Sequence, residues 1–240
     1  MYKHIILFKA ALLDIRNEWS WYLLLMIVSP LSILFFLQII AGGLIDYNSY
    51  IVGSIVMTFG TGIFLSLGQT FALYKATSSM DYYLALPLSK IEIIVSLVFR
   101  NIILSIPSMA FILLIGAFLY NVTIVIGLPL IIAIFLTSVS LAGVGTMIGV
   151  CSKNMQIASI LTQVLTPIFT YLAPVFVIQS KLPKFVLYIS YLLPTTYAAN
   201  AMRNALQSNT YSYDYIILTL ISVVSLFYVS KVLDWRNERT

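Results

Sequence analysis

Residues 124–150 read IVIGLPLIIAIFLTSVSLAGVGTMIGV and contain no charged side chain. An α-helix rises 1.5 Å per residue, so a helix over this stretch is long enough to cross the roughly 30 Å of bilayer hydrocarbon. Only helices and closed barrels satisfy every backbone hydrogen bond in lipid, and an unbroken apolar run of this length favours a helix. The stretch therefore predicts a transmembrane helix.

The whole chain shares this apolar character. Of its 240 residues, 61% are hydrophobic and 9% are charged, and the mean hydropathy is +1.01. A soluble domain has about 25% charged residues. These values exclude a soluble globular domain and a disordered chain. The net charge of +5 is explained by basic loops that face anionic lipid, without any nucleic-acid partner.

Further apolar stretches also have the length of a membrane span. Together they predict spans at 20–41, 50–73, 97–119, 124–150, 156–179 and 213–232. Residues 2–18 carry an apolar stripe at helical spacing, which predicts an amphipathic helix in the membrane interface or, alternatively, one packed on the cytoplasmic face. Residues 181–212 contain an apolar run that is too short to span, bounded by Pro183 and Pro194. We predict an outer re-entrant helical hairpin there.

The distribution of basic residues predicts the orientation of the chain. Most lysines and arginines fall on the side that holds the N-terminus, and only Lys181, Lys184 and Arg203 fall on the other side. Basic residues concentrate on the cytoplasmic side of membrane proteins. We therefore expect an all-α polytopic protein of the plasma membrane, with six spans, one transmembrane domain over 1–240 and both termini in the cytoplasm.

Most enzyme signatures are missing from the sequence. There is no Gly-Lys pair and hence no P-loop, while His4 is the single histidine and Cys151 the single cysteine. No paired carboxylates lie inside a predicted span, which argues against a proton relay. We expect this chain to hold no metal and no cofactor. Gly145 and Gly149 are four residues apart in a span, which predicts a packing face of small residues.

Polar residues inside the spans are candidates for lining a transport pathway, because such groups face protein or water rather than lipid. The candidates are Gln38, Thr58, Gln69, Gln163 and Thr166. Hydrogen bonding between helices is the alternative explanation. In the predicted hairpin, Arg203 could pair with an anionic lipid or substrate, with Asp214, or with a backbone carbonyl.

Residues 73–93, LYKATSSMDYYLALPLSKIEI, connect the second and third predicted spans. Thr77 or Ser78 can cap a short helix that Pro87 ends. We predict a helix over 77–87 at the cytoplasmic membrane surface, on which a partner could push; an ordinary loop is the alternative.

This connecting segment resembles the coupling-helix region of ABC-2 type transporter permeases. The resemblance rests on Leu84, Pro87, Leu88, Ser89, Lys90, Glu92 and Ile93. The stretch with Leu182-Pro183, Leu193-Pro194-Thr195-Thr196-Tyr197 and Arg203 is similar to the family's sequence before its last helix. The chain departs from the family pattern at Lys75-Ala76-Thr77-Ser78-Ser79, where the family has an acidic opening.

The resemblance implies the ABC-2 permease fold, also called the type V ABC exporter fold. It implies a permease subunit that moves an amphipathic or lipid-linked substrate (a lipid, glycan precursor, drug or peptide) and does no catalysis itself. ATP and Mg would bind to a separate cytoplasmic ABC ATPase, present in two copies, and a second permease chain would complete a homo- or heterodimer. Membrane lipids would surround this assembly.

The same resemblance implies roles for particular residues. Coupling to the ATPase falls on Tyr83, Leu84, Leu86, Pro87, Ser89, Lys90 and Glu92, and the outer hairpin is marked by Pro194, Tyr197 and Arg203. Other readings of the sequence are a non-transporting scaffold or immunity protein of the same fold, a secondary transporter, or a membrane enzyme such as a lipid transferase.

Overall fold

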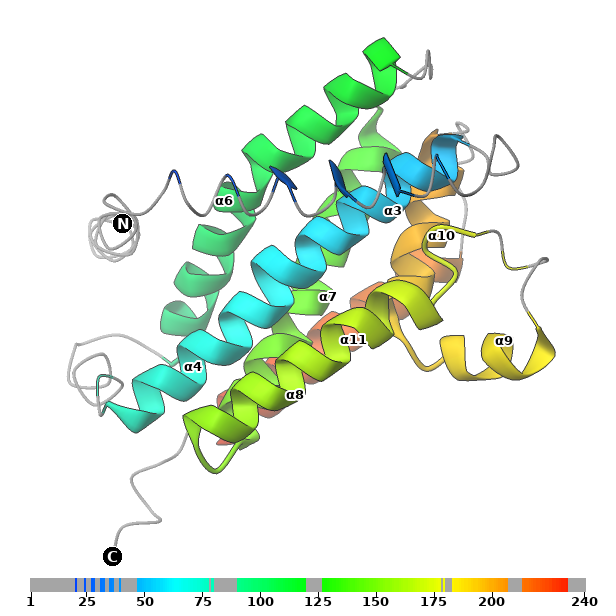
Figure 1. The fold of residues 1–240 in the computed structure, drawn as a ribbon. Helices are drawn as coiled ribbons and strands as arrows, with labels where there is room; N and C mark the ends of the chain where they lie inside the picture. The colour runs from blue at the N-terminus through cyan, green and yellow to red at the C-terminus, as the bar shows by residue number, and fades with distance from the viewer. Residues whose placement is uncertain are drawn as a thin grey trace, which may run out of the picture.

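The computed structural model describes residues 47–77, 90–119, 127–177, 183–206 and 213–232, with Ser79, Gln179 and isolated positions between 20 and 39. Within these residues the regular structure is all helical, which confirms the predicted all-α class (Figure 1). Helices long and apolar enough to cross a membrane cover Tyr47–Ala76, Ile91–Phe118, Leu128–Cys151, Met155–Leu172 and Tyr213–Val232. The predicted elements at 2–18, 20–41 and 77–87 lie wholly or largely outside the described residues.

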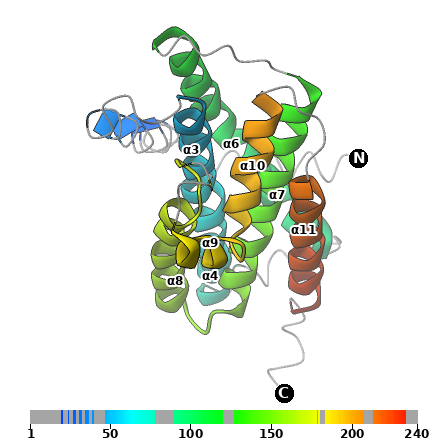
Figure 2. The same cartoon turned by 90° about the vertical axis from the view of Figure 1, so that its right-hand side faces the viewer.

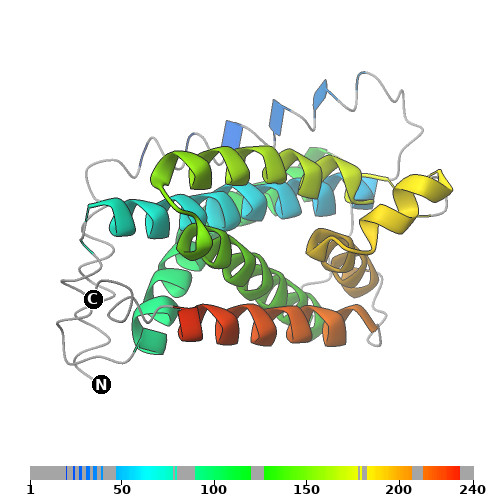
Figure 3. The same cartoon turned by 90° about the horizontal axis from the view of Figure 1, so that it is seen from below.

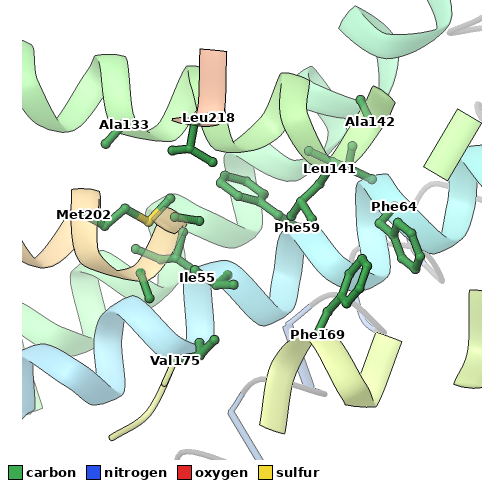
Figure 4. Packing of buried hydrophobic residues seen from close by; sticks show 14 of the residues in the cluster. Ile55, Phe59, Phe64, Ala133, Leu141, Ala142, Phe169, Val175, Met202 and Leu218 are labelled. Atoms are coloured by element: carbon green, nitrogen blue, oxygen red, sulfur yellow. The ribbon is translucent and has the colours of Figure 1, made fainter. Parts of the chain in front are cut away.

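A continuous helical rod runs through the centre of the bundle. It consists of α3 (Tyr47–Phe59), the π-helix η1 (Gly60–Leu65) and α4 (Ser66–Ala76). In the most apolar stretch of this rod, 83% of the residues are buried. A helix that is apolar on all faces is buried either in lipid or among other helices. Here the rod is buried among α6, α7, α8 and α10, and Figure 4 shows Ile55 and Phe59 of the rod among them.

The helix α7 (Leu128–Cys151) crosses the rod on one side and packs against α11 (Tyr213–Val232) on the other (Figure 3). A β-carbon on Gly145 would overlap the backbone of Phe64, and one on Gly149 would overlap the backbone oxygen of Gly68. Only glycine permits two helix backbones to approach so closely. This confirms the predicted packing face.

The helix α6 (Lys90–Leu119) begins earlier than the span predicted at 97–119. Its first turns are amphipathic, with Ile93 and Ile94 buried and Ile91 exposed. Glu92 in the first turn interacts favourably with the positive end of the helix dipole. A hydropathy pattern detects the membrane-embedded part of a helix, and it misses such an amphipathic beginning.

The span predicted at 156–179 is shorter in the structure, which corrects that boundary. The helix α8 (Met155–Pro167) continues into the π-helix η2 (Ile168–Leu172), and Ala173 is extended, with ψ of 151°. The residue before a proline avoids the helical region, and Pro174 follows directly. The chain therefore leaves the helix at Leu172.

Two short helices, α9 (Lys184–Ser190) and α10 (Pro194–Leu206), occupy the region of the predicted hairpin. The fixed φ of proline suits the first helical position, and α10 begins at Pro194. Figure 2 shows α10 alongside α7 and α11. Both short helices lie where α3 begins, which we call the Arg203 end; the opposite end, where α4 ends and α6 begins, is the Lys75 end (Figure 1).

We predict that Gly145→Ala destabilises the bundle, because the added methyl group meets backbone atoms of Phe64 that cannot move aside. Overpacking of this kind costs about 1–3 kcal/mol. The fall should be visible as a lower Tm of the purified chain in mild detergent. Gly60→Ala is the control, since its β-carbon would lie 3.7 Å from the Thr170 hydroxyl, an ordinary contact. Equal Tm values for the two variants would contradict the close approach of α4 and α7.

Candidate functional site

A small polar cluster joins α4 to α8, and we call it the polar seam. The Nε2 atoms of Gln69 and Gln163 both donate to the hydroxyl oxygen of Ser159, at 3.4 and 2.7 Å. Gln69 is half-buried and Gln163 is exposed. Two of the candidate pathway residues are thus brought together, at the edge of the rod. Ser159 was missed because an isolated serine in an apolar helix gives little signal; its spacing of four from Gln163 was the available clue.

The threonine candidates satisfy their hydrogen bonds within their own helices. The hydroxyl of Thr58 donates to the carbonyl of Ser54, and that of Thr166 donates to the carbonyl of Thr162. Thr58 is fully buried inside the bundle. Thr166 lies on the side of α8 that faces Gly60 of the rod. These two residues are therefore separate from the polar seam, and the remaining candidate, Gln38, lies outside the described residues.

Two π-helical segments meet next to the polar seam, on its side toward the Arg203 end. The rings of Phe64 in η1 and Phe169 in η2 are 4.9 Å apart (Figure 4). π-Helical turns are rare and often mark functional positions in helices. Hydropathy cannot detect them, because an extra residue per turn leaves the apolar character unchanged. The local signals were Gly60-Thr61-Gly62 before one ring and Thr166-Pro167 before the other.

The face of α8 that points away from the rod is exposed in the single chain. Large apolar side chains dominate it, and polar side chains lie among them. These residues are Gln156, Ile160, Gln163 and Val164, and Tyr171 of η2 is exposed as well. A mixed face next to the polar seam is suited to another protein surface or to a hydrated path, because glutamine amides are poorly accommodated by lipid alone.

At the opposite end of α8, Arg203 binds the unwound chain that follows η2. Its Nη2 donates to the carbonyl oxygens of Pro174, Val175 and Val177, and its Nε donates to the Ser49 hydroxyl of α3. We call this set the carbonyl clamp. Backbone carbonyls, which are among the partners predicted for Arg203, are thus confirmed. The clamp connects α10, the rod and the end of η2.

The other residues predicted to mark the hairpin lie in α10, which also contacts η2 and the end of α9. Thr195 in the first turn of α10 donates to the carbonyl of Phe169 at 2.6 Å. The hydroxyl of Tyr197 donates to the carbonyl of Tyr191 at 2.7 Å. Burial, and then the charge of Asp214 and the neighbouring Tyr191, raises the pKa of the Tyr197 phenol, which keeps it a neutral donor. Pro194 is buried at the start of the same helix.

At the Lys75 end, Lys75 caps the end of α7. Its Nζ donates to the carbonyl oxygens of Ser152 and Val150, at 3.0 and 3.4 Å. The last carbonyls of a helix lack partners and carry partial negative charge, so an ammonium group stabilises them. The sequence marked Lys75 only as a departure from a pattern.

Most residues proposed for coupling fall in the part of the chain that the structure does not describe. These are Tyr83, Leu84, Leu86, Pro87 and Ser89. Lys90 is the first residue of α6, and Glu92 is half-buried in its first turn. The segment that contains them therefore begins after the last residue of α4, Ala76, and ends where α6 begins, at Lys90.

One comparison with known proteins assigns a family to this architecture. The family described as ABC-2 type transporter matches residues 3–206. That range includes the polar seam, the carbonyl clamp and the whole segment between α4 and α6. The chain matches no curated protein.

We predict that Arg203→Met lowers the Tm, because three carbonyl oxygens lose a charged donor. Leaving such groups without a partner costs on the order of 1–3 kcal/mol. Arg203→Lys should restore only part of the loss, since an ammonium group lacks the planar fork of donors. Lys184→Met, which removes an exposed charge at the same end, should leave the Tm unchanged. A neutral effect of Arg203→Met would show that the clamp does not stabilise the fold.

Proposed function

The chain belongs to the ABC-2 type transporter family and is a membrane permease component of an ABC-type transporter; we propose that it exports an amphipathic or lipid-linked substrate, driven by a separate ATPase. The observation that carries this proposal is the position of the segment between α4 and α6. The segment resembles the family's coupling region in sequence, and its first end is the end of the buried rod. A force on this segment acts directly on the centre of the bundle.

A chain of contacts could carry that force through the molecule. Lys75, in the last turn of α4, fastens the helix to the end of α7 just before the segment begins. Along the rod, the polar seam joins α4 to α8 and the Phe64–Phe169 contact joins η1 to η2. The carbonyl clamp then holds the end of η2 against α10. Movement at the Lys75 end is therefore linked to the Arg203 end by contacts between successive elements.

A second permease chain fits the exposed face of α8. The rod is covered within the single chain, whereas α8 presents Gln163 and its apolar neighbours outward. We propose that two permease chains, identical or different, face each other through α8 and the first predicted span, and that the pathway runs between them past the polar seam. Two ATPase subunits bind ATP and Mg below them.

The proposed setting is the plasma membrane, with the Lys75 end and both termini in the cytoplasm. The first span at 20–41 brings the number of crossings to six. The helices α9 and α10 form the outer re-entrant hairpin. The basic residues Lys75, Lys153 and Lys231, which all lie at or near the Lys75 end, support this orientation.

The test of coupling is affinity purification of the tagged chain from native membranes in mild detergent, followed by mass spectrometry. We expect a P-loop ATPase in stoichiometric amount. Leu84→Asp should abolish its recovery and its substrate-stimulated ATP turnover, because a charge replaces the apolar side chain proposed to dock into the ATPase. Leu192→Asp makes the same change at an exposed site on the Arg203 end and should retain both.

An intact complex without any ATPase would contradict the exporter assignment and favour a scaffold or immunity protein of the same fold. Normal ATPase recovery and turnover with Leu84→Asp would contradict the coupling role of Leu84 while leaving the family assignment in place.

The proposed dimer predicts a specific cross-link. In a Cys151→Ser background, Gln163→Cys should form a disulfide-linked dimer in native membranes when the oxidant copper phenanthroline is added. Val223→Cys is the matched control, because Val223 is exposed on α11, away from the proposed interface. Cross-linking of Val223→Cys but not Gln163→Cys would place the partner chain on the other side of the bundle.

A further inference from the structure

Arg100 is a buried cation inside a membrane-spanning helix. It lies within the apolar window Ile91–Phe118 of α6, roughly 15 Å along the helix axis from Lys90. Its side chain is 8% exposed, and its Nε has no hydrogen-bond partner. Arg100 is not among the residues of the proposed transport path, and it takes part in none of the contacts described above.

The polar groups next to Arg100 bond to one another. Asn101 donates to the carbonyl of Leu97 and accepts a hydrogen bond from the Ser66 hydroxyl of α4. Ser105 donates to the carbonyl of Asn101. These groups therefore stabilise the contact between α6 and the rod, and none of them accepts a hydrogen bond from the Nε of Arg100.

No carboxylate in the described part of the chain neutralises Arg100. The carboxylates found there are Glu92 and Asp214. Glu92 lies roughly 12 Å away along the axis of the same helix. Asp214 lies at the Arg203 end, where it accepts a hydrogen bond from Asn200. A buried charge in hydrocarbon is expensive, and such residues usually pair or mark a ligand site.

The position of Arg100 on its helix leaves a route to it from the lipid. It lies at the border between the face of α6 that packs on the rod and the face that is exposed. Ser96, one turn before it, is half-buried, while Ile103 and Pro107, one and two turns after it, are exposed. The exposed side of this border is therefore the side of α6 from which a lipid headgroup would reach the guanidinium.

We propose that Arg100 binds the anionic phosphate group of a membrane lipid on the side of the bundle formed by α6. A guanidinium presents a planar fork of donors that matches phosphate oxygens, and a charge-assisted bond of this kind is strong where water is scarce. The bound phosphate neutralises the cation and completes its hydrogen bonds. This site goes beyond the proposed export function, because it requires neither an ATPase nor transport of the bound lipid.

The test measures the Tm of the purified chain in mild detergent with added short-chain lipids. Dioctanoyl phosphatidylglycerol, which is anionic, should raise the Tm of the wild type by roughly 5 °C at saturation. Dioctanoylglycerol, which lacks the phosphate, should not raise it. Arg100→Met should lose the response, and Arg100→Lys should keep a response at an affinity at least about tenfold weaker. Lys153→Met removes an exposed charge and should respond like the wild type.

Several outcomes would overturn the proposal. Equal stabilisation by dioctanoylglycerol would show that no phosphate is recognised, and full stabilisation by inorganic phosphate alone would show a soluble anion instead of a lipid. Loss of the response in Lys153→Met would show that surface charge attracts the lipid. If Arg100→Met does not fold, Arg100→Lys and the lipid comparison on the wild type still decide the question.

A carboxylate from outside the described residues is the rival partner for Arg100. Asp14→Asn, Glu18→Gln and Asp81→Asn should each leave the response to phosphatidylglycerol intact. A variant that instead lowers the Tm as much as Arg100→Met, with no further fall in the double variant, would assign the arginine to that carboxylate and refute lipid binding.

Discussion

The bundle depends on the burial of the rod formed by α3, η1 and α4. In lipid there is little hydrophobic force to hold helices together, so association relies on close packing and on hydrogen bonds between helices. The rod supplies both kinds of contact. Its backbone meets that of α7 at glycines, its side chains fill the space toward α8 and α10, and Ser66 hydrogen-bonds to α6. The other elements are arranged around it, and α11 joins through α7.

The same arrangement is compatible with the movements that a transporter of this family must make. A transporter must change shape without losing its packing, and here the centre is buried while its connections at each end are polar and specific. Lys75 holds the end of α7, and Arg203 holds the unwound chain after η2. Between them, single contacts such as Gln69 with Ser159 and Phe64 with Phe169 link neighbouring helices.

The sequence predicted the helical class, most spans and the small-residue face, because these depend on length, hydropathy and spacing. It placed the end of α8 too late, although Pro174 was visible, because hydropathy continues past the point where the backbone turns. It also could not predict that Arg203 would bind three carbonyls or that Arg100 would be buried without a described partner. Those properties arise from helices that are distant in the sequence.

The π-helix in the rod has one more consequence. A π-turn holds more residues than an α-turn, so the side chains after it point in directions that a continuous α-helix would not produce. In the rod, η1 sets an angular offset between α3, which packs on α6 and α10, and α4, which packs on α7 and α8. One span thus serves two different sets of neighbours, and the registration of Gly68 against Gly149 depends on the extra residue that η1 accommodates.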